Sequence, residues 1–206
     1  MYIPEFNRIE DREVSLAFMK ANPFAILIST SENGLVATHL PLLVEEAGND
    51  LILRGHFAKA NHQWSMIEEK DSLVIFHGPH AYISPSLYEV RESVPTWNYG
   101  TVHVYGKGRV LPDDGAVKQI LIDLTSRFDP SYYQQWLRLG EEYRDKMVRR
   151  IVAFEIKANR VETKFKLGQN RTQEEQDNLI RALEQSSDST AAGVAALMRQ
   201  RKLGSS

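Results

Sequence analysis

The chain has 206 residues, with 25 Lys and Arg against 27 Asp and Glu, a formal net charge of -2 and no cysteine. A chain of this size buries enough surface for a self-sufficient core, so neither disulfides nor a structural metal is required. The lack of cysteine excludes iron–sulfur clusters, thiolate zinc sites and cysteine nucleophiles. The polar N-terminus and the short apolar runs argue against a signal peptide and a membrane span, so we expect a cytoplasmic protein.

Hydrophobic periodicity predicts mainly short strands with helices near the start and in the second half of the chain. Apolar or alternating runs bounded by turn residues predict strands at residues 24–30, 35–44, 51–57, 72–77, 81–84, 101–110, 151–156 and 161–165. Apolar side chains at helical spacing predict helices at residues 11–22, 61–67, 113–128, 131–147 and twice in the polar tail from 169.

Strands and helices do not alternate regularly, which favours a small barrel over a doubly wound parallel sheet. We therefore predict a mainly β fold with flanking helices, of the α+β class. The expected domains are a barrel at residues 1–168, which includes the helices at about 113–150, and a helical extension at residues 169–206. We expect the extension to pack on the barrel or on a partner.

Several familiar catalytic and ligand motifs are missing. His77-Gly-Pro-His80 has two metal-ligating side chains, but a turn separates them and no further ligand lies nearby in the sequence, so no metal site is expected. A Gly-x-Ser-x-Gly turn and a Gly-x-Gly-x-x-Gly loop are both absent. No catalytic residue can be assigned from these patterns.

Polar and aromatic residues gather instead where strands end, at residues 38–41, 55–62 and 94–99. In the second cluster, Lys59 and the potential helix cap Asn61 lie at a predicted helix start, where unpaired backbone amides favour a bound phosphate. The alternative is ordinary loop chemistry. Trp97 and Tyr99 in the third cluster are equally compatible with a structural role.

These clusters lie within blocks that resemble the PaiB family. The blocks are MYIP (1–4), ATHLP (37–41), GHFAKAN (55–61), FHGPHAYISP (76–85), VPTWNY (94–99), VHVYG (102–106) and KFKLGQNR (164–171). The family is described as FMN-binding negative transcriptional regulators linked to repression of protease synthesis and sporulation. The resemblance runs from Met1 to about Arg199, and its ordered blocks are more specific together than any one alone.

The resemblance implies an FMN-binding split β-barrel, similar to pyridoxamine-phosphate oxidase, in which two protomers pair and the flavin lies at their interface. By this analogy, the flavin ring lies along Thr38, His39, Leu40 and Pro41, and the phosphate and ribityl chain face His56, Lys59 and Asn61. The remaining implied contacts are Thr96, Trp97, Asn98 and Tyr99 from the partner protomer, with Lys164, Lys166 and Gln169 near the cofactor.

One departure from the oxidase pattern concerns the phosphate. Oxidases of this fold offer more than one Arg, whereas the loop here has only Lys59, with Arg54 and Arg109 as candidate reinforcements. Each charge–dipole contact contributes roughly 0.3 to 1 kcal/mol at an exposed site, so we expect weak FMN binding. An apo protein, or one with another ligand, is the alternative.

The resemblance implies a homodimeric regulator, but the charge pattern gives no support to DNA as a partner. A protein that neutralises many phosphates normally has a basic face, and this chain is close to neutral without a recognisable helix-turn-helix pair. The alternative function is an FMN-dependent oxidoreductase, with His39 or His56 transferring protons. A third reading places haem or another planar ligand on His77 or His80.

Overall fold

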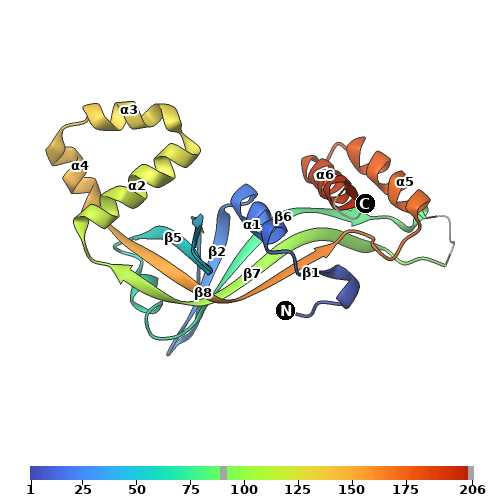
Figure 1. The fold of residues 1–206 in the computed structure, drawn as a ribbon, viewed down its shortest axis with the longest axis horizontal. Coiled ribbons are helices and arrows are strands. Elements are labelled where there is room, and N and C mark those ends of the chain that lie inside the picture. Colours follow the sequence, from blue (N-terminus) through green and yellow to red (C-terminus); the bar gives the residue numbers. More distant parts are fainter. Residues whose placement is uncertain (89–91, 204–206) are drawn as a thin grey trace. The chain divides into compact units, whose positions relative to one another are not determined.

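The computed structural model describes residues 1–88 and 92–203 and consists mainly of strands flanked by helices (Figure 1). Its strands are β1 (Arg8–Ile9), β2 (Phe24–Ser31), β3 (Gly34–Pro41), β4 (Leu43–Ala47), β5 (Asp50–Ala58), β6 (Ser72–Ile83), β7 (Thr96–Leu111) and β8 (Ile151–Lys166). Its α-helices are α1 (Arg12–Ala21), α2 (Asp114–Phe128), α3 (Pro130–Arg138), α4 (Glu141–Val148), α5 (Gln173–Glu184) and α6 (Ser189–Leu203). Short 3₁₀ turns occur at η1 (Glu5–Asn7), η2 (His62–Ser65) and η3 (Pro85–Leu87).

The strands form one sheet in the order β3-β2-β6-β7-β8-β5-β4, and β1 pairs with β8. The pairs β2–β3, β2–β6, β4–β5 and β5–β8 are all antiparallel. In the β5–β8 pair, the register runs from Ile52 opposite Lys157 to Ala58 opposite Ile151. This topology confirms the predicted mainly β class with flanking helices. Within the described ranges, no helix is long and apolar enough to cross a bilayer.

The chain divides into two compact units. Unit 1 comprises Met1–Phe18, His77–Val102 and Glu162–Ser206, and unit 2 comprises Met19–Phe76 and His103–Val161. The strands β6, β7 and β8 contribute residues to both units. The expected boundary between a barrel at 1–168 and an extension at 169–206 stays a prediction, and its residues 89–91 and 204–206 lie outside the described part.

The interior of unit 2 is filled by the inward side chains of its strands. Leu27, Leu53, Phe57 and Phe154 are almost fully buried, and the rings of Phe57 and Phe154 stack with centroids 4.7 Å apart. Fully burying side chains of this kind contributes roughly 1.5 to 3 kcal/mol each. The alternation of buried and exposed positions along β2 and β5 is the pattern that predicted these strands.

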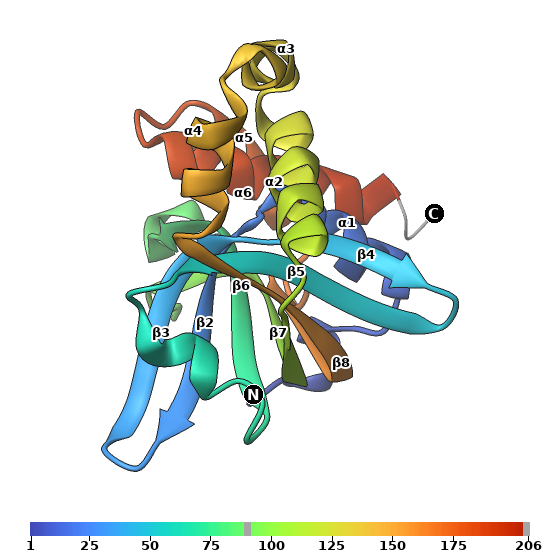
Figure 2. The same ribbon diagram turned by 90° about the vertical axis from the view of Figure 1, so that its left-hand side faces the viewer.

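A second apolar cluster in unit 2 lies beneath helices α2 and α4. It joins the buried residues Val117, Ile120 and Leu124 of α2 to Val148 of α4 and Ala153 of β8. Figure 2 shows α2 lying across β5, with α3 and α4 beside it. Helix α3 has no fully buried residue, but Tyr132, Tyr133 and Trp136 are half-buried and the helix contacts α2.

Unit 1 has its own core. The rings of Phe18 and Phe165 approach to 5.0 Å, and the buried residues of α5 and α6 include Leu179 and Val194. Helix α6 lies against β6, because a Cβ added at Gly193 would come within 2.7 Å of Pro79. The Thr190 hydroxyl donates to the His80 carbonyl at 2.8 Å. Within unit 1, α6 therefore packs on residues of β6.

Some predicted elements were wrong in extent. Strand β6 continues through Gly78-Pro79, where two strands were expected, because β2 pairs only with Leu73–Ile75 and begins too late to reach Pro79. The missing N–H of Pro79 therefore costs no hydrogen bond to β2. Strand β8 is likewise one strand rather than two.

Other predicted elements were interrupted. The expected strand 35–44 is divided into β3 and β4, and the expected helix 131–147 is divided into α3 and α4 with Gly140 as the N-cap of α4. The expected helix at 61–67 is the four-residue 3₁₀ turn η2. Apolar spacing alone does not distinguish a continuous helix from two helices in succession.

The long strand β7 depends on a glycine at position 106. A Cβ added there would lie 2.2 Å from the Lys157 carbonyl oxygen, which belongs to the neighbouring backbone and cannot move aside cheaply. We expect Gly106→Ala to lower the free energy of unfolding by about 2 kcal/mol or more, as overpacking does. Gly140→Ala is the control, because nothing lies within 4 Å of its added Cβ. Equal urea midpoints for the two variants would contradict this prediction.

Candidate functional site

The predicted phosphate loop follows β5 and ends in the turn η2. The backbone N–H of Asn61 donates to the Ala58 carbonyl at 2.8 Å, which closes the turn. The Asn61 side-chain oxygen then accepts from the Gln63 N–H at 3.0 Å and caps η2. The predicted capping role of Asn61 is therefore confirmed, although the element it caps is a single 3₁₀ turn.

Gln63, which the sequence analysis did not single out, fixes this loop to the β2–β3 hairpin. Its side chain is 1% exposed, and its Nε2 donates toward Leu27 O, Ser29 Oγ and Val36 O at 3.0 to 3.2 Å. Carbonyl oxygens only accept hydrogen bonds, so the amide nitrogen must face them. The amide oxygen consequently faces Thr38 and accepts its hydroxyl at 2.5 Å.

Thr38 and Asn61 are brought together by this arrangement. The Asn61 Nδ2 donates to Thr38 Oγ1 at 2.8 Å, while Thr38 donates its own proton to Gln63. The three side chains therefore form one connected polar network between β3 and η2. Networks of this kind are costly to leave half-satisfied, so they hold their members in one arrangement.

The strand β3 presents its predicted site residues on two different faces. Thr38 and Leu40 lie opposite buried residues of β2, and Leu40 is 4% exposed. Any contribution of Leu40 to a ligand therefore comes from its backbone. His39 and Pro41 alternate to the outer face, where the His39 ring lies 6.2 Å from the ring of Phe24.

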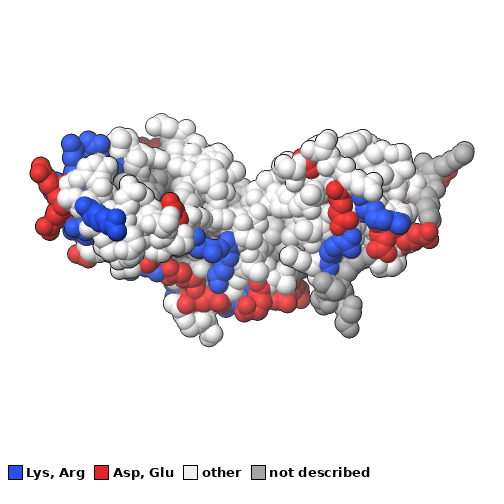
Figure 3. All heavy atoms as spheres, turned by 90° about the horizontal axis from the view of Figure 1, so that it is seen from above, with Lys and Arg blue, Asp and Glu red and all other residues white. Residues whose placement is uncertain are grey.

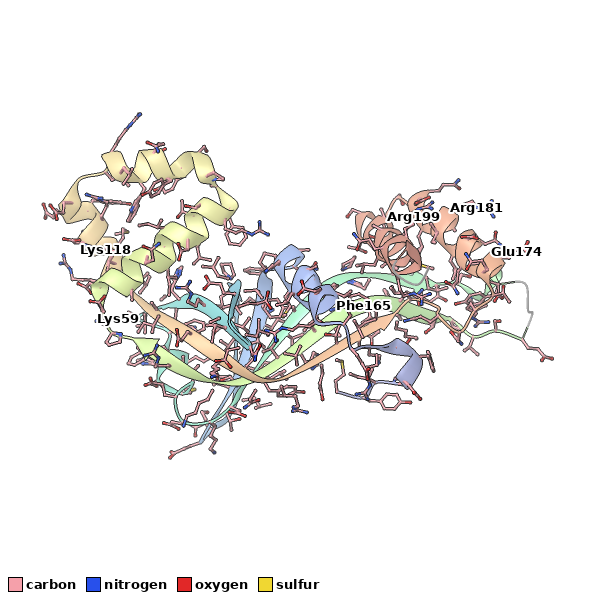
Figure 4. All side chains as sticks on the ribbon, viewed as in Figure 1. Lys59, Lys118, Phe165, Glu174, Arg181 and Arg199 are labelled. Atoms are coloured by element: carbon pink, nitrogen blue, oxygen red, sulfur yellow. The ribbon has the colours of Figure 1, made fainter. Side chains whose placement is uncertain are left out.

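Lys59 is an exposed cation with no ion pair to any residue in the described ranges. Its N–H donates to the Arg150 carbonyl at 2.8 Å and its carbonyl accepts from the Trp64 indole at 3.2 Å, so the backbone is fixed beside the start of β8 (Figure 4). The predicted phosphate contact with free backbone amides at a helix start was wrong. The element η2 has only four residues, and the backbone N–H of Gln63 already donates to the Asn61 side chain.

His56 is not brought to the side chains of Thr38 and Asn61. It lies opposite Ala153, whose side chain belongs to the cluster under α2 and α4, and cross-strand partners share a face. His56 is half-buried, its Nδ1 has no hydrogen-bond partner among the described residues, and burial lowers its pKa. Burial therefore favours the neutral form of the imidazole over the charged form.

The two candidate reinforcing arginines are already neutralised. Arg54 pairs with Glu45 and lies 3.9 Å from Asp123, and Arg109 pairs with Glu155 at 2.8 Å. These carboxylates offset the positive charge of Arg54 and Arg109, which reduces the attraction of both residues for a phosphate. The sequence could not reveal these partners, because Arg109 and Asp123 meet theirs from distant strands and helices.

The second predicted group lies in unit 1 and contains two paired lysines. Lys166 donates to the Thr96 hydroxyl. Lys164 is buried, donates to the Tyr2 carbonyl at 3.2 Å and lies 5.4 Å from the centre of the Tyr99 ring. The structure therefore brings Thr96, Tyr99, Lys164 and Lys166 into two neighbouring contacts on β7 and β8.

Two amides complete this group in different ways. The Gln169 oxygen accepts from Leu167 N–H at 2.7 Å and its nitrogen donates to Phe165 O, so both ends hold the turn at Gly168, where φ is +75°. Gln169 thus shapes the chain after β8. Asn98 is 1% exposed, and its Nδ2 has no hydrogen-bond partner in the part of the chain that is described.

Trp97 belongs to an exposed aromatic group on β6 and β7. It packs edge-to-face on Tyr82 at 5.8 Å and lies 6.0 Å from the His80 ring, and both large rings are about half exposed. His80 Nδ1 lies 3.2 Å from His77 Nε2. No group of three metal-ligating side chains was found among residues 1–88 and 92–203.

The sheet and its flanking helices are those of split-barrel flavin-binding proteins, as predicted. The "FAD and Heme binding protein" from Mycobacterium smegmatis has a TM-score of 0.60 at 17% identity, covering 83% of this chain and 78% of that one. The flavocytochrome Anf3 from Azotobacter vinelandii has a TM-score of 0.58 at 14% identity, covering 80% and 72%. At these identities the likeness concerns the fold alone.

The family is given by sequence. The family described as "Putative FMN-binding domain" matches residues 1–160. The "Protease synthase and sporulation protein PAI 2" of Bacillus subtilis (strain 168) is 36% identical over 206 residues, which is 98% of each chain. The chain therefore belongs to this family, and the predicted resemblance to the PaiB proteins is confirmed.

The Gln63 network generates a stability prediction. Replacing Gln63 with Leu leaves Leu27 O, Val36 O and the Thr38 hydroxyl without their partner, and each buried unsatisfied group costs about 1 to 3 kcal/mol. We expect Gln63→Leu to lower the free energy of unfolding by at least about 2 kcal/mol in urea melts. Gln135→Leu, on the exposed surface of α3, should stay within about 0.5 kcal/mol of the wild type. Similar losses in both variants would count against the network.

His56 generates a pH prediction. Because burial lowers its pKa in the folded state, the unfolded chain binds a proton first as the pH falls through about 6.5. The wild type should therefore lose stability between about pH 7 and pH 5. In His56→Gln that contribution should be missing, which chemical melts at several pH values would measure. Parallel pH profiles for the two proteins would refute the assignment.

Proposed function

We propose that this protein binds FMN, with Lys59 on the phosphate and the flavin ring along β3. The observation that carries the proposal is Lys59 itself, an exposed cation without a carboxylate partner among the described residues, held at both backbone groups in a chain of the FMN-binding family. The phosphate of FMN carries nearly two negative charges and suits such a cation. Neutralised Arg54 and Arg109 favour the weak binding expected from the sequence.

The residues around Lys59 have separate parts in this proposal. Asn61 and Thr38 hold the loop and the strand together through Gln63, and the outer face of β3 offers His39 and Pro41 to the ring. The flavin, when bound, supplies reversible electron or hydride chemistry. Thr96, Trp97, Asn98 and Tyr99 are proposed to contact the cofactor from the partner protomer, with Lys164, Lys166 and Gln169 also near the cofactor.

We propose the regulatory function from the relative named for protease synthesis and sporulation. The charges support a role as a flavin-binding regulator better than one as a tight DNA binder, because Lys and Arg are interspersed with Asp and Glu over the face in Figure 3. A homodimer is expected, with the apolar outer face of β2 and β3 as the candidate contact, where Phe24 is 64% and Leu35 is 76% exposed. The elution volume in size-exclusion chromatography distinguishes a dimer from a monomer.

The rival function is an FMN-dependent oxidoreductase. Of the two histidines considered for proton transfer, His39 has the better access, since His56 lies on the face covered by α2. Consumption of NAD(P)H with added FMN would favour the enzyme. Background turnover, together with retardation of promoter DNA at physiological salt, would favour the regulator.

Lys59 gives the direct test of the phosphate assignment. Lys59→Ala should weaken FMN binding by about tenfold while leaving riboflavin binding nearly unchanged, because only FMN carries the charge. Fluorescence titration of cofactor-stripped protein with each ligand measures both constants. Lys107→Ala, another exposed lysine of unit 2, serves as the control. Equal losses for FMN and riboflavin would refute the role of Lys59.

A further inference from the structure

The antiparallel ladder of β5 and β8 ends at a turn on each strand. Ala58 lies opposite Ile151, and the next residue on each side, Lys59 and Arg150, are joined by the 2.8 Å bond from Lys59 N–H to Arg150 O. This bond brings the backbones of Lys59 and Arg150 together where the two strands meet their turns. The two residues are therefore neighbours in space, although they are distant in the sequence.

Among the described residues, neither cation is neutralised by a carboxylate, unlike four other basic residues of unit 2. Arg54, Arg109, Lys118 and Lys157 each have a carboxylate partner. Lys59 and Arg150 are exposed, and neither forms an ion pair within residues 1–88 and 92–203. Like charges on neighbouring residues repel one another, so an anion bound by both would offset this repulsion and add two attractions.

Both residues are held in place at the backbone. The Lys59 carbonyl accepts from the Trp64 indole, and Arg150 N–H donates to the Met147 carbonyl at 3.1 Å as α4 ends. The bases of the two side chains are thus fixed before any ligand arrives, which lowers the entropy lost on binding. The long side chains remain free to close on a ligand.

We propose that Arg150 is the second cation of the phosphate site, so that Lys59 and Arg150 together bind a phosphate monoester dianion. Arg presents paired N–H groups that fit two phosphate oxygens, and Lys adds a point charge. The identity of the ligand as FMN rests on the proposed function. The pair itself rests on the hydrogen bond from Lys59 N–H to Arg150 O, which brings a second cation beside the loop.

The first experiment compares two adjacent arginines. Arg150→Gln should weaken FMN binding by about tenfold and leave riboflavin binding unchanged, and Arg150→Lys should recover part of the loss. Arg149→Gln is the matched control, because it removes the same charge from the next residue, which is also exposed. We expect its FMN constant within about twofold of the wild type. Equal effects of the two Gln variants, or no effect of Arg150→Gln, would overturn the proposal.

A second experiment separates this inference from the proposed function. Inorganic phosphate should raise the unfolding midpoint of the wild type above that in chloride at equal ionic strength, and should not do so in Lys59→Gln or Arg150→Gln. Stabilisation by phosphate without FMN binding would support the Lys59–Arg150 anion site and refute the proposed binding of FMN. FMN binding that needs Lys59 but not Arg150 would keep the function and remove the pair. An equal phosphate effect in all proteins would indicate an adventitious ion only and also overturn it.

Discussion

The register between β5 and β8 is the constraint on which the rest of unit 2 depends. It joins two segments about a hundred residues apart and fixes the contacts on both faces of the sheet. Phe57 and Phe154 stack inside, and His56 and Ala153 share the face beneath α2 and α4. A shift of one residue would exchange these faces and place His56 in the barrel core.

The same register links stability to ligand chemistry. Side chains inside the ladder, such as Phe57 and Phe154, pack in the core. Lys59 and Arg150, just beyond the ladder, are exposed and carry like charges. The Gln63 network then fixes the loop that carries one of these charges to the β2–β3 hairpin. The sheet thus positions the irregular loop after β5, and binding residues commonly lie on loops that a rigid scaffold positions in this way.

Most of the strands, the helices α1, α2 and α5, and the mainly β class could be predicted from local periodicity and turn residues. The wrong predictions concerned where one element ends and the next begins. Strand β6 continues through Pro79, which lies beyond the residues of β6 that pair with β2. Gly140 separates α3 from α4, where the apolar spacing predicted one continuous helix. Strand pairing decides the first case and local capping the second. The spacing of apolar residues along the sequence reveals neither strand pairing nor helix capping.

The candidate site was predictable in part. Lys59 and Asn61 could be identified from the loop, and Asn61 does cap the turn that follows. Gln63 could not be recognised, because its role depends on carbonyl groups of β2 and β3 that only the fold brings near. The neutralisation of Arg54 and the placement of Arg150 depend equally on distant pairing. Assigning the unit 1 residues to the same cofactor remains a prediction from the family.

Helix α3 has a consequence for motion rather than for binding. None of its residues is fully buried, and its half-buried side chains, Tyr132, Tyr133 and Trp136, lie outside the apolar cluster under α2 and α4, so its opening exposes less apolar surface than the opening of β5 or β8. Its amide protons can therefore exchange through a local opening that leaves the barrel intact, while those of β5 and β8 require a much larger opening. We therefore expect hydrogen exchange in unit 2 to be slow in β5 and β8 and faster in α3.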